Sequence, residues 1–498
     1  MRKSLSRNPD LILFWIAGYF LLAIIVRIIR SPALEIDETQ AALTQFLLWG
    51  YGSQPPLYHW LQYGLSELFG MSIATLSLLK NATLLLSCLF FWLTVRLLTQ
   101  DRALSGLATL GMLTLPPIFL MSQRDLSHTV MALLTVCLFL YAFFLTLKRP
   151  SLAGYLLAGA AVGLGALSKY NFILVPLAAA LALIPEKDLR ARLMDWRMLL
   201  AVILSILIVL PHAIWMLHHP DLVTGQTMGE MTEGREHISF HGFDGALDLV
   251  LAALKGAVLT VAIFAALFYR DIKRIASASD QWTRIIGRML LIVFFLLLVI
   301  IFVLGATNIR QKWLIVYLVL LPLYLSLKIR AAGVEAKPKL PAMLTVASVL
   351  TIGVLLILLT RGLVAPYFGR YSIVHIPYDT FAKAVMRDGF AQPRYVIAPN
   401  VMVGGNLRIQ FPNATVLTGD PAIERAPQTF PQGATVLLAG TTDDGKLPED
   451  PAAALDALAA RSSLPAPTDI RDVSVAYRGG DKTKKHAFYY AWSVIGRN

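Results

Sequence analysis

Residues 11–29 read LILFWIAGYFLLAIIVRII, and the acidic pair Asp37 and Glu38 follows shortly after them. A helix needs about 20 mostly apolar residues to cross a bilayer. Arg27 is the one charged residue in the run. The stretch therefore predicts a transmembrane helix with carboxylates close to its far end.

The composition extends this interpretation to the whole chain. Of 498 residues, 56% are apolar and 15% are charged, and the mean hydropathy is +0.63. Soluble domains have about 25% charged residues. Cys88 and Cys137 both lie in apolar runs, so they indicate no disulfide framework. These values exclude an ordinary soluble enzyme, a disordered protein and a disulfide scaffold, and they predict a polytopic membrane protein.

The same length rule predicts about eleven transmembrane helices. No internal repeat is recognisable, which disfavours transporter folds because those are often built from repeats. The predicted spans are 11–29, 72–95, 103–121, 126–147, 152–168, 171–184, 198–217, 246–269, 285–306, 313–327 and 341–360.

The basic residues indicate the orientation of these helices. Lys and Arg number 44 against 31 Asp and Glu, a net charge of +13. If the N-terminus is cytoplasmic, most of this excess falls in cytoplasmic loops, such as 187–197, 270–284 and 328–339. The charge then reports orientation, and no nucleic-acid partner is implied. The expected location is a bacterial inner membrane, with the C-terminus in the periplasm.

The chain divides into two predicted domains. Residues 1–360 form a transmembrane catalytic domain with periplasmic loops at 30–71 and 218–245. Residues 361–498 are rich in Pro and Gly and alternate short β-type runs with helical stretches, which predicts a periplasmic α/β domain. The β-type runs are 394–398, 415–418, 435–439, 473–477 and 486–494, and the helical stretches are 378–388 and 451–461.

The first periplasmic loop contains two predicted interfacial helices, one entering at Asp37 and one at 57–69. As a purely structural alternative, Asp37 and Gln40 have the spacing of a capping box. Carboxylates next to an apolar span are costly, however, and they usually serve function. Asp37 and Glu38 are therefore candidate catalytic residues, although adjacent positions on a helix point about 100° apart.

A second acidic position is Asp125, in the stretch Ser-Gln-Arg-Asp at 122–125. Ser122 and Asp125 again fit a capping box, and Arg124 fits interfacial snorkelling. On the same side of the membrane as Asp37, however, Asp125 is also a candidate catalytic carboxylate. Such a group can take a proton from an acceptor hydroxyl or orient an acceptor phosphate.

Few basic residues are expected on the periplasmic side, so Lys169, Arg310 and Lys312 are informative. Because positive charge there opposes the positive-inside rule, each should have a partner. One alternative is a lipid head group. The other is the phosphate of a lipid-linked substrate, which Arg binds bidentately and Lys binds as a point charge.

The loop at 218–245 holds His237 and His241, four residues apart, a spacing that suits a metal on a helix. Spacing fixes no third ligand, so a polar loop over the outer cavity is the alternative. The sequence has no GxxxxGK[ST], GxGxxG or Cys-based metal motif. No cofactor is therefore required, with a divalent metal at these histidines left open.

Several short motifs, in this order and spacing, resemble the polyprenyl-phosphate-sugar glycosyltransferases of family 39. They are the acidic pair, Pro-Pro-Leu-Tyr at 55–58, Ser-Lys-Tyr at 168–170, the basic-Trp-Leu motif at 312–314 and the α/β tail. This group is similar to protein O-mannosyltransferases and to the aminoarabinose transferases of lipid A. Residues 34–58 and 404–412 look closest to bacterial members related to the rhizobial galacturonosyltransferases of lipid A and core.

The resemblance implies a GT-C fold and inverting transfer of a sugar from a polyprenyl phosphate. Asp37 matches the catalytic aspartate of the first loop, Glu38 completes the pair, and Asp125 matches the acid of the second loop. Lys169 matches the lysine that reaches the donor phosphate.

One position departs from the aminoarabinose transferases. Where they often have a Lys before Pro-Pro-Leu, this chain has Gln54. That phosphate contact is therefore either missing or supplied elsewhere, by Arg310 or Lys312. The expected cavity residues are Arg124, Gln54, Tyr58 and Tyr170.

The sequence thus predicts an integral membrane glycosyltransferase with a polyprenyl-phosphate-sugar donor. The expected acceptor is lipid A, lipopolysaccharide or another cell-envelope glycolipid, and membrane lipids are further expected partners. A protein O-glycosyltransferase of the same family and a lipid or solute transporter are the alternatives, and a non-catalytic scaffold would not need Asp37, Asp125 and Lys169 on one side.

Overall fold

The structure is a computed structural model that describes residues 8–222, 241–304, 311–388, 392–419, 427 and 429–496. The chain forms two compact units. The first unit consists of Met1–Leu21, Gly52–Tyr58 and Asn81–Val354. The second unit consists of Leu22–Tyr51, His59–Lys80 and Leu355–Asn498.

Long apolar helices dominate the described residues. Seven of them are long and apolar enough to cross a membrane, and a bent pair makes an eighth. The chain is thus a multi-pass membrane protein, as the composition predicts. The seven are α2 (Leu11–Arg30), α4 (Ile73–Thr99), α7 (His128–Lys148), α11 (Trp196–His218), α13 (His241–Leu267), α15 (Gln281–Leu304) and α18 (Leu340–Leu363).

The other predicted spans are bent or short. The span predicted at 103–121 is α5 (Arg102–Met112) followed, at a 65° bend, by η2 (Pro117–Met121) and α6 (Ser122–Arg124). Pro116 and Pro117 explain the bend, because proline gives no backbone N–H to the helix. The remaining helices of this kind are α8 (Leu152–Ala166), η3 (Tyr170–Ile173) with α9 (Leu174–Leu183), and α16 (Ile315–Leu318) with α17 (Leu320–Ala331).

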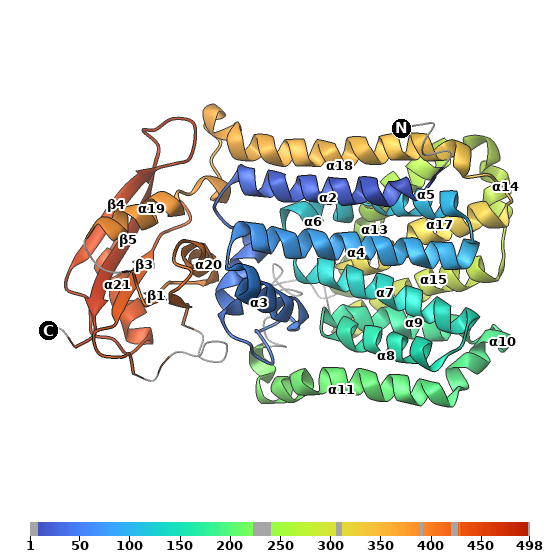
Figure 1. The fold of residues 1–498 in the computed structure, drawn as a ribbon, viewed down its shortest axis with the longest axis horizontal. Helices are drawn as coiled ribbons and strands as arrows, with labels where there is room; N and C mark the ends of the chain where they lie inside the picture. The colour runs from blue at the N-terminus through green and yellow to red at the C-terminus, as the bar shows by residue number, and fades with distance from the viewer. Residues whose placement is uncertain are drawn as a thin grey trace. The chain divides into compact units, whose positions relative to one another are not determined.

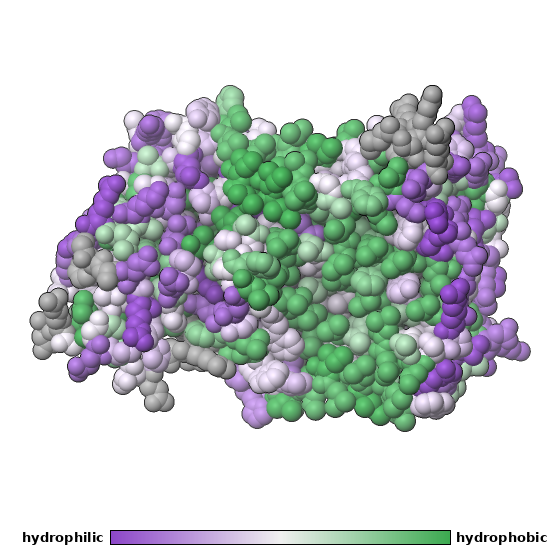
Figure 2. Space-filling model, viewed as in Figure 1, coloured by the Kyte–Doolittle hydropathy of each residue, from purple (hydrophilic) through white to green (hydrophobic). Residues whose placement is uncertain are grey.

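Small residues let the helices of the first unit approach closely. In Figure 1, α7, α8 and α11 lie side by side, and α8 packs against both of the others. A Cβ added at Gly159 of α8 would lie 2.7 Å from Ala201 Cα of α11. Such small-residue contacts are typical of membrane helices. Apolar side chains cover the outside of the helices and form the broad green band in Figure 2.

The second unit contains a five-stranded sheet with the order β2-β1-β3-β5-β4. β1 is parallel to β2 and β3, whereas β5 is antiparallel to β3 and β4. All five predicted strand positions are confirmed. The strands are β1 (Tyr395–Ile397), β2 (Thr415–Leu417), β3 (Thr435–Gly440), β4 (Ile470–Ala476) and β5 (Lys485–Val494).

Helices pack against both faces of this sheet (Figure 1). α19 (Tyr378–Val385) and α20 (Val401–Gln410) share one apolar core with the sheet, which includes Phe381, Leu407 and Phe488. α21 (Pro451–Arg461) packs Leu455 into the core of the other face. α19 and α21 follow the predicted helical stretches, whereas α20 was not predicted.

The first loop also belongs to the fold. α3 (Leu57–Phe69) has the predicted bounds. The helix predicted to enter at Asp37 is instead the 3₁₀ helix η1 (Ile36–Gln45), which leaves helical geometry at Thr44. This segment packs against α20.

Candidate functional site

Asp125 lies where a distorted helix stops. The π-helical turn η2 leads into α6, and α6 ends at Arg124 with Asp125 as its C-cap. The next residue, Leu126, is buried and has a φ of 64°, in the left-handed region that non-glycine residues rarely adopt. The capping-box interpretation of Ser122 and Asp125 is therefore wrong, because Asp125 closes a helix. Backbone outliers of this kind gather at functional sites.

The side chains around Asp125 are polar. Arg124 Nη2 lies 3.2 Å from Asp125 Oδ2, and the Asp125 side chain is buried while that of Arg124 is about half exposed. Gln123 donates a hydrogen bond of 3.1 Å to Asn81 Oδ1 on α4. Arg124 thus pairs with the carboxylate that the sequence singles out.

Lys169 is held beside the segment that follows Asp125. Its Nζ donates a hydrogen bond of 2.6 Å to the hydroxyl of Thr129, in the first turn of α7. The neighbouring Ser168 hydroxyl lies 3.1 Å from that of Thr135, one turn or more further along α7. Both contacts fix the end of α8 against α7, so the second-loop acid and the lysine come from adjoining elements.

The Pro-Pro-Leu-Tyr motif joins the same cluster. The N–H of Leu57 donates a hydrogen bond of 3.0 Å to the carbonyl of Leu167. The ring of Tyr58 lies 5.7 Å from that of His128, measured between centroids. The Gln54 side chain, which precedes this motif, is half-buried. Residues 55–58, 125–129 and 167–170 thus meet in the first unit although they are far apart in sequence.

The basic-Trp-Leu motif adjoins this cluster through Asn171. Asn171 Nδ2 donates to the carbonyl of Trp313 at 3.0 Å, and the Tyr317 hydroxyl donates to the carbonyl of Asn171 at 2.7 Å. Lys312 lies in η7 (Gln311–Trp313), directly before this contact. Arg310 lies outside the described residues.

Two histidines near these motifs were missed by the sequence interpretation. His128 is buried three residues after Asp125. His212 of α11 is buried with its Nε2 3.1 Å from the hydroxyl of Tyr170, and the rings of His212, Trp215 and His219 stack in succession. Neither histidine belongs to a spaced motif. The sequence could have indicated them only as polar residues inside predicted spans.

In the second unit, Glu38 is locked in an ion pair. Arg27 donates to it through Nε at 2.8 Å and through Nη2 at 2.5 Å, and both side chains are buried. Arg27 also donates to the carbonyls of Ser31 and Ala33. Burial by itself raises the pKa of the Glu38 carboxyl, but the charge and hydrogen bonds of Arg27 outweigh it and lower the pKa to about 2. Glu38 is therefore ionised and fastens the loop to the end of α2.

Asp37 has different surroundings from its neighbour. It is half-buried and is the second residue of η1, whose N-cap is Glu35. The N–H of Glu35 donates to Glu38 Oε2 at 3.2 Å, so Glu38 makes the reciprocal contact at this helix start. The capping-box interpretation of Asp37 and Gln40 is therefore wrong. Asp37 remains the candidate for chemistry in this loop.

α20 supports the loop that carries Asp37. Asn406 Oδ1 accepts the N–H of Leu34 at 2.7 Å, and Arg408 donates to the carbonyl of Ala41. Gln45 exchanges two hydrogen bonds of 2.7 Å with the backbone of Val416. A Cβ at Gly405 would lie 2.7 Å from Thr39 Cα, so glycine is required for this approach. The segment 404–412, noted for its resemblance to rhizobial enzymes, thus holds the first loop in place.

The metal hypothesis stays a prediction. His237 and the side chain of His241 lie outside the described residues. Within the described part of the chain, no group of three or more His, Cys, Asp or Glu residues is arranged to hold a metal ion.

The described residues combine apolar helices long enough to cross a membrane with a five-stranded sheet, and the candidate acids and lysine lie at helix ends. Residues 53–215 match the family described as dolichyl-phosphate-mannose-protein mannosyltransferase. The chain matches in fold the crystal structure of ArnT from Cupriavidus metallidurans bound to undecaprenyl phosphate, with a TM-score of 0.59, 13% identity and coverage of 97% of this chain and 99% of that one.

Two curated relatives from Rhizobium johnstonii (strain DSM 114642 / LMG 32736 / 3841) match nearly the whole chain. Lipopolysaccharide core galacturonosyltransferase RgtA is 38% identical over 485 residues, 96% of each chain. Lipopolysaccharide core galacturonosyltransferase RgtB is 36% identical over 497 residues, 99% of each chain. The chain therefore belongs to the glycosyltransferase family of RgtA and RgtB. The predicted resemblance, GT-C fold and enzyme class are confirmed.

Proposed function

We propose that the protein transfers galacturonic acid from a polyprenyl phosphate to the core of lipopolysaccharide. The observation that carries the sugar and the acceptor is the match to RgtA and RgtB over almost the full length of each chain. The donor class is supported by Lys169, a cation that donates a hydrogen bond to Thr129, four residues after the buried acid Asp125. The donor is already activated, which agrees with a sequence that lacks nucleotide-binding motifs.

The proposed reaction is a single inverting displacement. An acceptor hydroxyl oxygen attacks the anomeric carbon, the bond from that carbon to the phosphate oxygen breaks, and polyprenyl phosphate leaves. Asp37 takes the hydroxyl proton. Lys169 stabilises the charge that grows on the leaving phosphate, where a fixed cation is worth most in the transition state.

Secondary roles follow from the surroundings of each residue. Asp125, held beside Arg124, orients the acceptor. Lys312 adds positive charge toward the donor phosphate, because this chain has Gln54 where the aminoarabinose transferases often have a lysine. Arg310 is proposed for the same phosphate. Glu38 acts through the position of the loop, because Arg27 occupies its carboxylate.

The proposed setting is a bacterial inner membrane, with the site on the periplasmic side. The reaction needs no cofactor, so transfer in membranes should survive chelation with EDTA. Loss of activity that zinc or magnesium restores would instead assign a metal to the loop of His237 and His241.

The deciding experiment is mass spectrometry of lipopolysaccharide from cells with and without the gene. Loss of one hexuronic acid from the core oligosaccharide on deletion, restored by the wild-type gene and not by Lys169→Gln, supports the proposal. A protein O-glycosyltransferase is the second candidate, because the family matched over 53–215 is described as a protein mannosyltransferase. An unchanged core together with a lost hexose on periplasmic glycopeptides would favour that candidate.

A further inference from the structure

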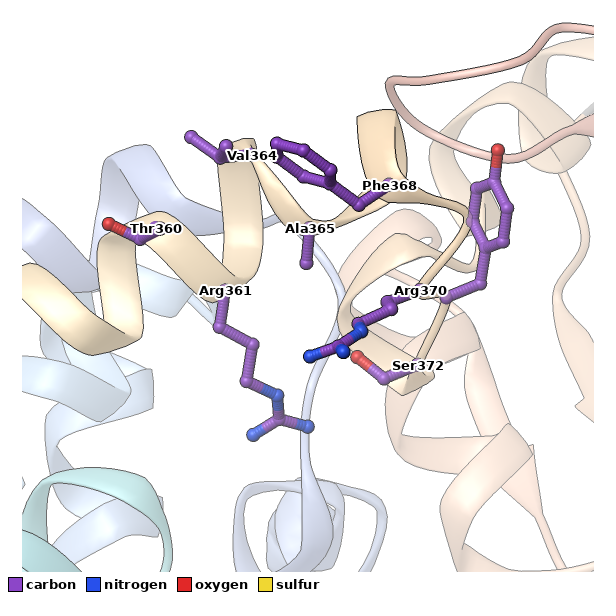
Figure 3. Close-up of a pocket in the computed structure, with 8 residues that line it drawn as sticks. Thr360, Arg361, Val364, Ala365, Phe368, Arg370 and Ser372 are labelled. Carbon is purple, nitrogen blue, oxygen red and sulfur yellow. The ribbon is translucent and has the colours of Figure 1, made fainter.

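A cavity of about 760 Å³ lies at the C-terminal end of α18, in the second unit, and none of its lining residues is assigned to transfer. Its wall runs from the last turn of α18 through η9 (Ala365–Phe368) to Ser372. Figure 3 shows the guanidinium groups of Arg361 and Arg370 reaching toward the same region, beside the Ser372 hydroxyl. Its volume falls within the range of small-molecule pockets, roughly 300–1,000 Å³.

Positive charge exceeds negative charge in this cavity. Arg361 Nη2 lies 3.0 Å from Glu35 Oε1, but Arg30 occupies the other oxygen of that carboxylate at 2.6 Å. One buried carboxylate thus faces two guanidinium groups. Arg370 is exposed and has no ion-pair partner within the described part of the chain.

The helix end does not cancel this charge. A helix C-terminus is normally the negative end of the dipole, since its last carbonyls are unpaired. Here the N–H of Val364 donates to the carbonyl of Thr360 at 2.8 Å. His375 Nδ1 accepts the N–H of Ser372, so Nε2 carries the proton and donates to the carbonyl of Arg361 at 3.0 Å. The carbonyls of Thr360 and Arg361 are therefore occupied, which leaves fewer unpaired carbonyls to oppose the charge of the arginines.

The rim of the cavity is apolar and exposed. Val364 and Phe368 line it, and Phe368 is 77% exposed while the adjacent Tyr367 is 71% exposed. They follow directly on a helix that is long and apolar enough to cross a membrane. Aromatic side chains at a helix end are typical of the membrane–water interface. Figure 2 shows apolar surface along this helix up to its end. An occupant of this cavity would therefore meet acyl chains at the rim and cations inside.

We propose that this cavity binds the phosphate of an anionic membrane lipid. Arg370 and Arg361 bind the phosphate oxygens, as guanidinium groups do bidentately, and the Ser372 hydroxyl donates a further hydrogen bond. The acyl chains lie along Val364 and Phe368. The site goes beyond the proposed function, and two sources share this chemistry: a bulk phospholipid and a phosphorylated glycolipid.

Lipid binding to the purified full-length protein tests the site. Native mass spectrometry would compare phosphatidylglycerol, bisphosphorylated lipid A and diacylglycerol with the same chains as the phospholipid. The wild type should prefer the phosphate-bearing lipids, and Arg370→Gln should weaken their binding about tenfold, the value of one charge-assisted hydrogen bond. Arg370→Lys should retain part of the binding. Arg387→Gln, an exposed arginine of the same unit outside the cavity, is the matched control.

The outcomes separate the sources. Loss of phosphatidylglycerol binding in Arg370→Gln supports a phospholipid site, and loss for lipid A alone supports a glycolipid site. Equal binding by Arg370→Gln and wild type, or diacylglycerol binding as tight as that of phosphatidylglycerol, would overturn the proposal. Because binding needs no transfer, Asp37→Asn should bind as the wild type does, so this test fails or succeeds independently of the proposed reaction.

Discussion

At the scale of single residues, two adjacent carboxylates have different tasks. Glu38 is buried in a two-point contact with Arg27, whereas Asp37 is half-buried and outside that contact. The sequence predicts that the two side chains point in different directions, because neighbouring residues on a helix lie about 100° apart. It could not predict which of the two holds the loop, since Arg27 lies within an apolar run and carries no motif.

We expect Asp37→Asn and Glu38→Gln to fail in different ways. Asp37→Asn should lower transfer by 10²- to 10⁴-fold, the usual contribution of a general base, without changing the melting temperature. Glu38→Gln leaves Arg27 buried without its counter-charge, so it should lower the free energy of unfolding by about 3 kcal/mol. Thermal unfolding in detergent, measured beside the transfer rate, distinguishes them. A destabilised Asp37→Asn protein would contradict the assignment.

The same ion pair predicts an acid-sensitive stability. The folded protein holds the pKa of Glu38 at about 2, below its ordinary value of 4.5. The contribution is therefore complete above pH 4.5 and is lost as the pH falls toward 2, by roughly 3 kcal/mol. Between pH 5 and 2.5 the melting temperature of the wild type should fall more steeply than that of Glu38→Gln. Parallel pH curves for the two proteins would show that Glu38 titrates normally.

Histidines mark the limit of residue-level prediction. His128 and His212 are buried near the motifs, but each lies inside a predicted span and belongs to no spaced motif. The partner of His212 is Tyr170, which lies on a different helix. Contacts of this kind depend on how helices pack, and hydropathy does not determine that packing.

At the scale of elements, local pattern predicts the sheet and α3 better than it predicts α20. Alternating apolar residues place all five strands, and the bounds of α3 and α21 follow from amphipathic runs. Val401–Gln410 contains two adjacent glycines, which disfavour a helix by about 1 kcal/mol each. α20 forms because packing against η1 outweighs that propensity, and the same glycines permit the packing.

Gly405→Ala should therefore be far more damaging than its size suggests. Its Cβ would lie against the backbone of Thr39, two residues from Asp37, and backbone cannot yield as a flexible side chain does. We expect a loss of 1–3 kcal/mol in unfolding free energy, as for overpacked cores, and reduced transfer. Gly353→Ala in α18 is the matched control, since nothing lies within 4 Å of that Cβ. It should be neutral or stabilising, because alanine favours helices. Equal unfolding free energies and transfer rates for the two variants would exclude a role of Gly405 in holding the first loop.

At the scale of the whole molecule, hydropathy predicts a multi-pass protein but not the form of each span. Among the described residues seven helices are long and apolar enough to cross a membrane, and other predicted spans are the bent α5–η2 pair or short helices such as α8 and α9. A window average cannot separate one straight helix from two short ones. The bend after α5 could have been read from Pro116 and Pro117.

Orientation is the whole-molecule property that charge alone predicts. The excess of Lys and Arg in alternate loops predicts a cytoplasmic segment at 187–197 and a periplasmic tail. Cys88 and Cys137 are buried, and replacing both with Ala leaves no native cysteine that could react with a maleimide. In intact spheroplasts a membrane-impermeant maleimide should label Glu449→Cys and not Asp188→Cys, two exposed positions. Lysis should make both react. Labelling of Asp188→Cys in intact spheroplasts would invert the topology, and it would put the tail on the side where nucleotide sugars are made.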